Sequence, residues 1–435
     1  MTDPSRRRRT RLLAGAAMAT ATLMALSGCG TQEDAKTLTW YIDPDNGGKA
    51  AMAEACTEAS GGKYTIRTSM LPSDAAGQRE QLIRRLASKD NSIDIMSIDT
   101  VYVPEFANAD FIAPVPEEYV DEFTDDVVEA AVESSMWEDQ LVVAPVQANT
   151  QILWYRKSVA EAAGLDMSKP VTWDQIIEAA KDQDKEIGAQ GIRAESLTVW
   201  VNALYESQGE PIVKDPEAEP EDTELGLDSP AGEKAAEIVD TIGSEGLGGP
   251  NFSNLDEQGA MLRFQGDNGG FMVNWPFVYP AMKAAVEDGS LDQEVFDDVG
   301  WAQYPAVEEG TPGAAPLGGG KLAVGAFSDH QDEAFEAISC IRETQKQSEY
   351  YITDGLPPAT RAAFDDPKVQ EEAPYSDAIL DSLEVAKSRP ISPYYNGITG
   401  GIQRTWHPPA DVSPQSTPKT SADLILEILR GEALL

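Results

Sequence analysis

Four side chains that could bind a polar ligand come directly after strand-like runs of the sequence. They are Asp43 after "TLTWYI", Asp99 at the end of "SIDIMSID", Asn149 between two extended runs, and Trp275 after "GGFMVN". Because the carboxyl ends of strands in an open parallel sheet border the ligand crevice, we expect these side chains to converge there. Carboxylates and amides hydrogen-bond to pairs of hydroxyl groups, and an indole face covers the apolar side of a pyranose ring. The residue types therefore favour a sugar site.

Two of these side chains also have a purely structural alternative. Trp275 alone would be a core residue, and Asp99 alone would cap the helix that follows it. Their joint placement at predicted strand ends favours a ligand site over these separate roles.

Motifs of enzymes are mostly missing. Only two histidines, His330 and His407, are present, and the sequence has no HExxH and no GxSxG motif. The run "LGGGKL" around Lys321 resembles a phosphate loop, but Ala315 stands where that motif needs Gly and Leu322 where it needs Ser or Thr. We therefore predict that the protein is not an enzyme.

A calcium loop is also incomplete. Asp43, Asp45 and Glu54 have the spacing of its positions one, three and twelve, but Gly47 offers no side-chain ligand at position five. We expect no metal and no cofactor. Acidic residues are numerous enough for two of them to flank a glycosidic bond, so a secreted glycosidase stays an alternative.

The charge balance excludes one large class of partners. The 435 residues contain 74 Asp and Glu against 33 Lys and Arg, a formal net charge of −41. Such a surface repels phosphate backbones and anionic lipids, so we expect no nucleic-acid partner.

The beginning of the sequence has the three parts of an export signal. A cationic run, 6–11, precedes an apolar run, 12–26, and the small residues Ser27 and Gly28 precede Cys29. The order Leu-Ser-Gly-Cys matches the bacterial lipobox. We predict a signal peptide over 1–28, a lipid on Cys29 that anchors the protein at the extracytoplasmic face of the cell membrane, and a tether over 29–36. The alternative is an uncleaved anchor with an incidental cysteine.

Two further cysteines remain, Cys56 and Cys340. In an exported chain such a pair is more commonly bridged than free, so we predict a disulfide between them.

Strand-like and helix-like segments alternate along the chain. The order strand, helix, strand, helix, strand over residues 37–99 favours α/β lobes, each a mostly parallel sheet flanked by helices. Thr172 with Gln175 predicts a capping box, and Ser229 before a proline predicts another helix start. The Gly- and Pro-rich run 310–327 predicts a crossing between domains, and the chain length predicts two of them.

Several stretches resemble the extracellular solute-binding proteins of ABC importers for oligosaccharides. They are "WYRKSVAEAAGLDMSKPVTWDQIIEAAK", "GDNGGFMVNWPF", and the run from "GGGKLAVGAF" to "GLPPAT", and they follow the family's order behind a lipobox. "NWPFVY" and "GIQRTWHPPADVSP" are similar to the trehalose- or maltose-type lipoproteins of high-GC Gram-positive bacteria.

The resemblance implies a periplasmic-binding-protein type II-like fold of two lobes with a hinge. Lobe one would contain 37–148 and 320–357, and lobe two 149–319 and 358–435. The family topology would place Cys56 and Cys340 on neighbouring helices of lobe one.

The resemblance also implies roles for individual residues. Asp99 and Asn149 would bind sugar hydroxyls, Glu257 would accept others, and Trp275 would stack on a ring. Arg404 would be a further contact, as would Asp43 and the backbone around Gly319. The structural alternatives are a solvated Glu257 and an Arg404 paired with a carboxylate of lobe two.

The function so implied is capture of a disaccharide, trehalose first and maltose-type second, by hinge closure. The closed monomer would deliver the sugar to the membrane permease subunits of an ABC importer. A binding protein for another carbohydrate or a non-sugar solute stays an alternative.

Overall fold

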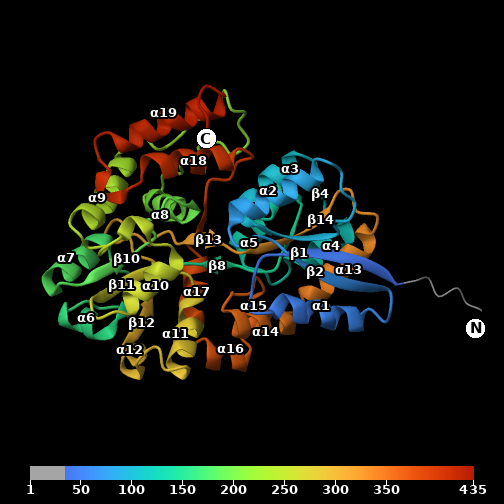
Figure 1. Cartoon of the computed structure of the whole chain (residues 1–435), viewed down its shortest axis with the longest axis horizontal. Helices are drawn as coiled ribbons and strands as arrows, with labels where there is room; N and C mark the ends of the chain where they lie inside the picture. The colour runs from blue at the N-terminus through green and yellow to red at the C-terminus, as the bar shows by residue number, and fades with distance from the viewer. Residues whose placement is uncertain (1–34) are drawn as a thin grey trace, which may run out of the picture. The chain divides into compact units, whose positions relative to one another are not determined.

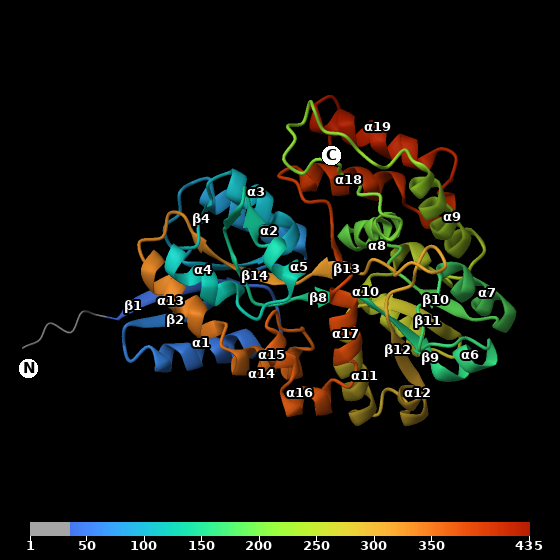
Figure 2. The ribbon, with the colours of Figure 1, turned by 180° about the vertical axis from the view of Figure 1, so that it is seen from behind.

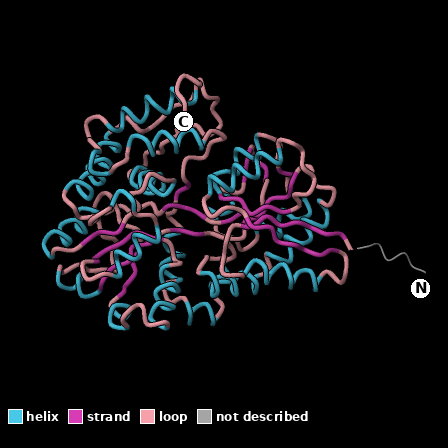
Figure 3. The backbone as a smooth tube through the Cα atoms, viewed as in Figure 1, coloured by secondary structure: helices cyan, strands magenta, loops and turns pink. Residues whose placement is uncertain are grey.

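The computed structural model describes residues 35–435, and Lys36–Leu435 form one unit of it. The predicted signal peptide, Cys29 and all of the tether before residue 35 lie outside the described residues. Two sheets, each surrounded by helices, divide the unit Lys36–Leu435 into two lobes (Figure 1, Figure 3). The two-lobed α/β fold is therefore confirmed.

Lobe one is built on a sheet with the strand order β2-β1-β3-β14-β4. These strands are β2 (Tyr64–Met70), β1 (Lys36–Ile42), β3 (Ile95–Asp99), β14 (Gly320–Gly325) and β4 (Ile112–Ala113), and β7 (Ala144–Pro145) also pairs with β14. Side chains of β1 alternate between the two faces, as the period of a strand requires. Trp40 and Ile42 join the core under α1 (Gly48–Ala59) and α13 (Gln331–Ile341), whereas Tyr41 joins the core under α2 (Ala75–Leu86) and α3 (Val103–Asn108).

Lobe two is built on the sheet β10-β11-β9-β12. These strands are β10 (Glu186–Gly188), β11 (Gly269–Asn274), β9 (Ile152–Arg156) and β12 (Val299–Ala302). Its core contains the fully buried Trp154, Trp173 and Trp200. The predicted capping box is confirmed, because Thr172 and Gln175 exchange both bonds at the start of α7 (Trp173–Gln183). Ser229 likewise caps α9 (Pro230–Ser244) by accepting from the Gly232 amide.

A third small sheet lies between the two large ones (Figure 2). It pairs β13 (Pro316–Gly318) with β8 (Asn149–Thr150) in antiparallel and with β15 (Lys387–Ser388) in parallel. The chain passes into lobe two after β8 and returns from β13 to β14 of lobe one. The predicted crossing in the Gly- and Pro-rich run therefore lies at β13 and β14.

The strand directions differ in part from the expectation of mostly parallel sheets. β1 pairs in parallel with β2 and β3, and β10 pairs in parallel with β11. β14 is antiparallel to β3, and β9 is antiparallel to β11 and β12. The reason is topological: β9 and β14 each follow a crossing, so each enters its sheet from the side of the other lobe.

The remaining elements complete the two lobes around these sheets. In chain order they are α4 (Glu117–Thr124), α5 (Glu129–Glu133), β5 (Met136–Trp137), β6 (Gln140–Leu141), α6 (Lys157–Ala162), α8 (Glu195–Glu206), α10 (Glu257–Gln265), α11 (Val278–Glu287), α12 (Gln293–Asp297), α14 (Thr344–Asp354), α15 (Arg361–Phe364), α16 (Pro367–Glu372), α17 (Ser376–Leu383), α18 (Tyr395–Thr405) and α19 (Thr417–Leu429), with short 3-10 turns at Thr100–Tyr102, Phe252–Asn254 and Pro409–Asp411. Within residues 35–435, no helix combines the length and the apolar character needed to cross a bilayer.

A disulfide joins the first helix of lobe one to a helix of its returning segment. Cys56 of α1 and Cys340 of α13 are bonded, with their Cα atoms 5.8 Å apart. The bond closes a loop with a sequence separation of 284 residues, which contains all of the lobe-two sheet.

Candidate functional site

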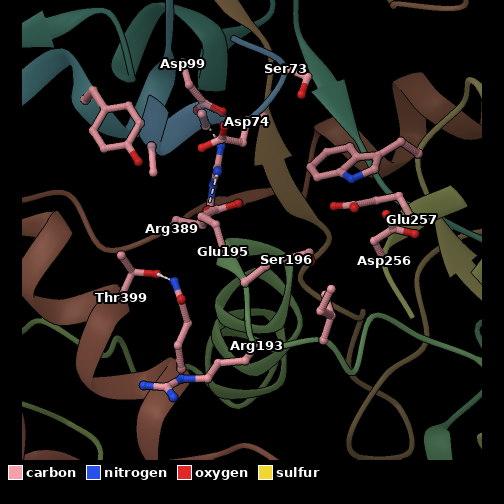
Figure 4. Close-up of a pocket in the computed structure, with 18 of the residues that line it drawn as sticks. Ser73, Asp74, Asp99, Arg193, Glu195, Ser196, Asp256, Glu257, Arg389 and Thr399 are labelled. Carbon is pink, nitrogen blue, oxygen red and sulfur yellow. Dashed lines mark hydrogen bonds and ion pairs between the residues drawn. The ribbon is translucent and has the colours of Figure 1, made fainter. Parts of the chain in front are cut away.

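A cavity of about 1170 Å³ lies between the lobes (Figure 4). Its wall includes the end of β3 and the start of α2 from lobe one, β13 from the crossing, and the starts of α8 and α10 from lobe two. Six of the seven predicted ligand-binding residues line it, namely Asp99, Asn149, Glu257, Trp275, Gly319 and Arg404.

The seventh predicted residue, Asp43, is described by the structure but does not line this cavity. Its carboxylate pairs with the ammonium group of the buried Lys49, at 2.7 Å. After β1 the chain turns directly into α1, and Lys49 in the first turn of that helix holds the carboxylate.

Asp99 both caps the turn that follows β3 and lines the cavity. Its Oδ1 accepts from the Val101 amide at 3.3 Å and so caps the short 3-10 turn after β3. The same oxygen accepts from Nη2 of Arg389 at 2.6 Å. The carboxylate is thereby fixed at the cavity wall, as expected for a side chain at the carboxyl end of a strand.

Arg389 is a central residue of the site that sequence reasoning missed. The Arg389 side chain is 3 % exposed. Its guanidinium group donates to Asp99 of lobe one and, through Nη1, to Oε1 of Glu195 at 2.6 Å (Figure 4). The Tyr395 hydroxyl donates to the same Glu195 oxygen at 2.5 Å. Burial opposes the charge, but the two carboxylates outweigh it and hold the pKa of Arg389 well above its ordinary value.

The local sequence gives little indication that Arg389 and Glu195 belong to the site. Arg389 directly follows β15, which has only two residues, so no strand periodicity leads up to it. Glu195 begins α8, where Ala194 stands at the N-cap and makes no side-chain capping bond. A carboxylate in a first helical turn is stabilised by the helix dipole, but that preference alone does not identify a site.

Glu257 is the first residue of α10, directly after the N-cap Asp256, which accepts from the Gly259 amide at 2.7 Å. Glu257 is half-buried in the cavity wall and is not the solvated residue of the alternative interpretation. Burial raises the pKa of its carboxyl group to about 7, and the charges of Glu195 and Asp256 act in the same direction. Near neutral pH this side chain can therefore either donate or accept a hydrogen bond.

Trp275 follows β11 and is half-buried, unlike the fully buried tryptophans of the lobe-two core. Its indole ring packs on Gly318 of β13, where an added Cβ would lie 3.0 Å from the ring. Its amide donates to Asn274, whose side chain in turn donates to the Glu257 carbonyl at 2.8 Å. The ring is thus seated on backbone and lines the cavity.

The crossing contributes an acceptor and a glycine. Oδ1 of Asn149 is buried and has no hydrogen-bond partner within the described part of the chain, which makes it available to a ligand donor. Gly319 has a φ of +116°, and an added Cβ there would lie 2.5 Å from the Gln147 carbonyl. Only glycine fits this position, where the backbone approaches the cavity.

Arg404 of α18 lies at an exposed part of the wall. Its Nη1 donates to the Leu434 carbonyl. The structural alternative expected a carboxylate of lobe two as its partner instead. Over residues 35–435, no group of three or more His, Cys, Asp or Glu side chains is placed to hold a metal ion.

A cavity between two α/β lobes, with charged side chains from both, is the arrangement of a protein that binds a solute by closing around it. The chain belongs to the bacterial extracellular solute-binding protein family, whose model matches residues 51–375. Among curated proteins it is similar to the "Probable ABC transporter-binding protein" of Deinococcus radiodurans, with 24 % identity over 83 % of this chain and 85 % of that protein.

Two solved structures illustrate the likeness in fold. The maltose-bound MalE3 of T. maritima has a TM-score of 0.76 and 23 % identity, and the alignment covers 92 % of this chain and 100 % of that one. The GacH receptor of Streptomyces glaucescens, solved without ligand and with acarbose, has a TM-score of 0.73 and 18 % identity, with 92 % and 100 % coverage. At these identities the likeness shows the fold alone.

Proposed function

We propose that the protein captures a disaccharide in this cavity and delivers it to the membrane permease subunits of an ABC sugar importer. The observation that carries the proposal is that Asp99 from lobe one and Glu257 and Trp275 from lobe two line one cavity. Carboxylates suit the hydroxyl groups of a sugar, and the indole face suits its apolar side. Asn149 adds an acceptor and Arg389 a fixed cation.

Trehalose is the proposed ligand, with a maltose-type sugar second. The resemblance of the sequence to trehalose- and maltose-type lipoproteins supports this choice. Two structural neighbours were solved in complex with maltose and with acarbose, which are an oligosaccharide and an oligosaccharide analogue.

Closure of the hinge is the proposed mechanism of capture. A ligand favours closure only by making contacts in the closed form that the open form lacks, and a sugar that touches Asp99 and Trp275 touches both lobes. We propose lobe boundaries at 148/149, 319/320 and 357/358. The antiparallel pairs Gly318 with Asn149 and Pro358 with Gln147 lie next to these boundaries.

We further propose that the protein acts as a monomer tethered by a lipid on Cys29. Residues 1–28 would direct export and be removed, and 29–36 would leave the lobes free to reach the importer. The lipobox order supports the anchor.

Calorimetric titration tests the proposed function. The delipidated protein, from residue 30 on, is titrated with trehalose, maltose and, as a control of another chemical class, a dipeptide. A micromolar dissociation constant, which corresponds to about −8 kcal/mol, is expected for one disaccharide. Binding of the dipeptide and of no sugar would show that the ligand is a different solute.

The fate of the sugar distinguishes a binding protein from the alternative, a glycosidase. A binding protein returns the disaccharide intact after the titration, whereas a glycosidase releases glucose. Chromatography of the ligand after prolonged incubation distinguishes the two, and release of glucose would overturn the proposal.

A further inference from the structure

The chain returns to the cavity after its last helix. Gly431, with a φ of +72°, reverses the backbone at the end of α19, and the amides of Glu432 and Ala433 donate to the Glu427 carbonyl at 2.8 and 3.2 Å. Leu435 then lines the cavity. Figure 2 shows this end of the chain beside α18. We refer to Gly431–Leu435 as the return segment.

The return segment is fixed to the side of α18 that faces the cavity. Arg404 donates to the Leu434 carbonyl. An added Cβ at Gly400 would lie 2.2 Å from Cδ2 of Leu435, so this leucine packs directly on the bare Cα of the glycine. Gly400 and Arg404 are four residues apart and share one face of the helix, and both line the cavity.

The return segment introduces an apolar surface into a polar wall. Leu435 lines the cavity and is 54 % exposed, and Leu434 next to it lies outside the lining and is 86 % exposed, whereas the neighbouring wall consists of Asn396, Thr399 and Gln403 of α18. The Leu435 side chain offers no hydrogen-bond partner to a sugar ring placed against it, whereas the polar side chains beside it do.

The volume of the cavity does not by itself limit the ligand to two rings. At about 1170 Å³ it exceeds the range of roughly 300 to 1,000 Å³ that is common for small-molecule sites. We infer that the return segment is an end wall of the cavity that sets how many sugar units the protein accepts, with Arg404 as the positioning residue that holds it. This inference rests on the proposed function and names the length selectivity of the same site.

The double variant Leu434→Ala/Leu435→Ala tests the end wall. Parent and variant are titrated with trehalose and maltosyltrehalose, and with maltose and maltotetraose. The ratio of the dissociation constants of the longer to the shorter sugar is expected to fall at least tenfold in the variant. Leu262→Ala is the matched control, because Leu262 is 63 % exposed on α10 but does not line the cavity, and it should leave the ratio unchanged.

Two further variants, Gly400→Ala and Arg404→Gln, are expected to displace the return segment without changing its own residues. Gly400→Ala places a methyl group against Leu435 and is expected to lower the same ratio. Gly397→Ala, on the same helix, places its Cβ 3.3 Å from Ile428 and Leu429 instead and should not. Arg404→Gln removes the bond to Leu434 and should act in the direction of Gly400→Ala. Melting curves establish that each variant is folded.

The outcomes distinguish a failure of the end wall from a failure of the proposed function. If the parent binds a sugar but neither the double leucine variant nor Gly400→Ala changes the ratio, the end wall is wrong and the proposed function stands. If the parent binds none of the four sugars, the proposed function fails, and the end wall fails with it.

Discussion

Replacement of Glu257 by glutamine should stabilise the ligand-free protein in a pH-dependent way. Burial raises the pKa of this carboxyl group from 4.5 to about 7. Between these values the folded protein keeps a proton that the unfolded chain releases, so the stability of the folded state falls as the pH rises through this window. Above pH 7 the folded protein carries an ionised, half-buried carboxylate, and glutamine removes that charge without a change of shape.

The size of the effect follows from the two pKa values. Each pH unit between them corresponds to about 1.4 kcal/mol, so Glu257 destabilises the parent by about 3 kcal/mol at pH 8 and by under about 1 kcal/mol at pH 5. An unfolding entropy of ~0.8 kcal/mol per kelvin for a chain of this size converts the first figure into a rise of the melting temperature by about 4 °C.

Thermal melting of the parent and Glu257→Gln at pH 5 and pH 8 measures both quantities. Glu371→Gln is the control, because it makes the same chemical change on the exposed surface of α16 and should shift the melting temperature at neither pH. An equal shift for Glu257→Gln at the two pH values would refute the argument, since a packing effect does not depend on protonation.

Four further changes test other parts of the molecule. Trp275→Ala should weaken disaccharide binding by about 1 to 3 kcal/mol in calorimetry and hardly change the ligand-free melting curve, and the reverse result would make Trp275 a core residue. Arg389→Gln leaves two carboxylates without their buried cation and should cost about 3 to 5 kcal/mol in denaturant unfolding, so an unchanged midpoint contradicts the bridge. Cys56→Ser/Cys340→Ser should cost about 3 to 5 kcal/mol, and two reactive thiols in the unfolded, unreduced parent would argue against the bond. Cys29→Ala should abolish labelling by a radioactive fatty acid, and label retained on the variant would rule out this lipid site.

The sequence predicts those site residues that end a recognisable strand. Asp99 is the last residue of β3 and Trp275 follows β11, the buried runs of both strands are long enough to show their pattern, and both side chains line the cavity. Asp43 also follows a strand, but its carboxylate pairs with Lys49 and does not line the cavity. A tertiary contact of this kind is not visible in the strand pattern.

Other parts of the site depend on contacts between distant segments. Arg389 is joined to Asp99 across 290 positions and to Glu195 across 194, and the two-residue strand before it has no periodicity to detect. The directions of β9 and β14 likewise depend on the lobe from which the chain arrives, and hydrophobic periodicity carries no information on direction.

The disulfide makes a large part of the chain a covalently closed loop. Because Cys56 lies before the first crossing and Cys340 lies after the return from β13 to β14, the chain between them, which contains the whole sheet of lobe two, is a closed loop whose two ends are joined in lobe one. A protease cut within the acidic loop 215–224 would therefore produce two fragments that stay attached. The cleaved protein would migrate as one species in a denaturing gel without reductant and as two species with it.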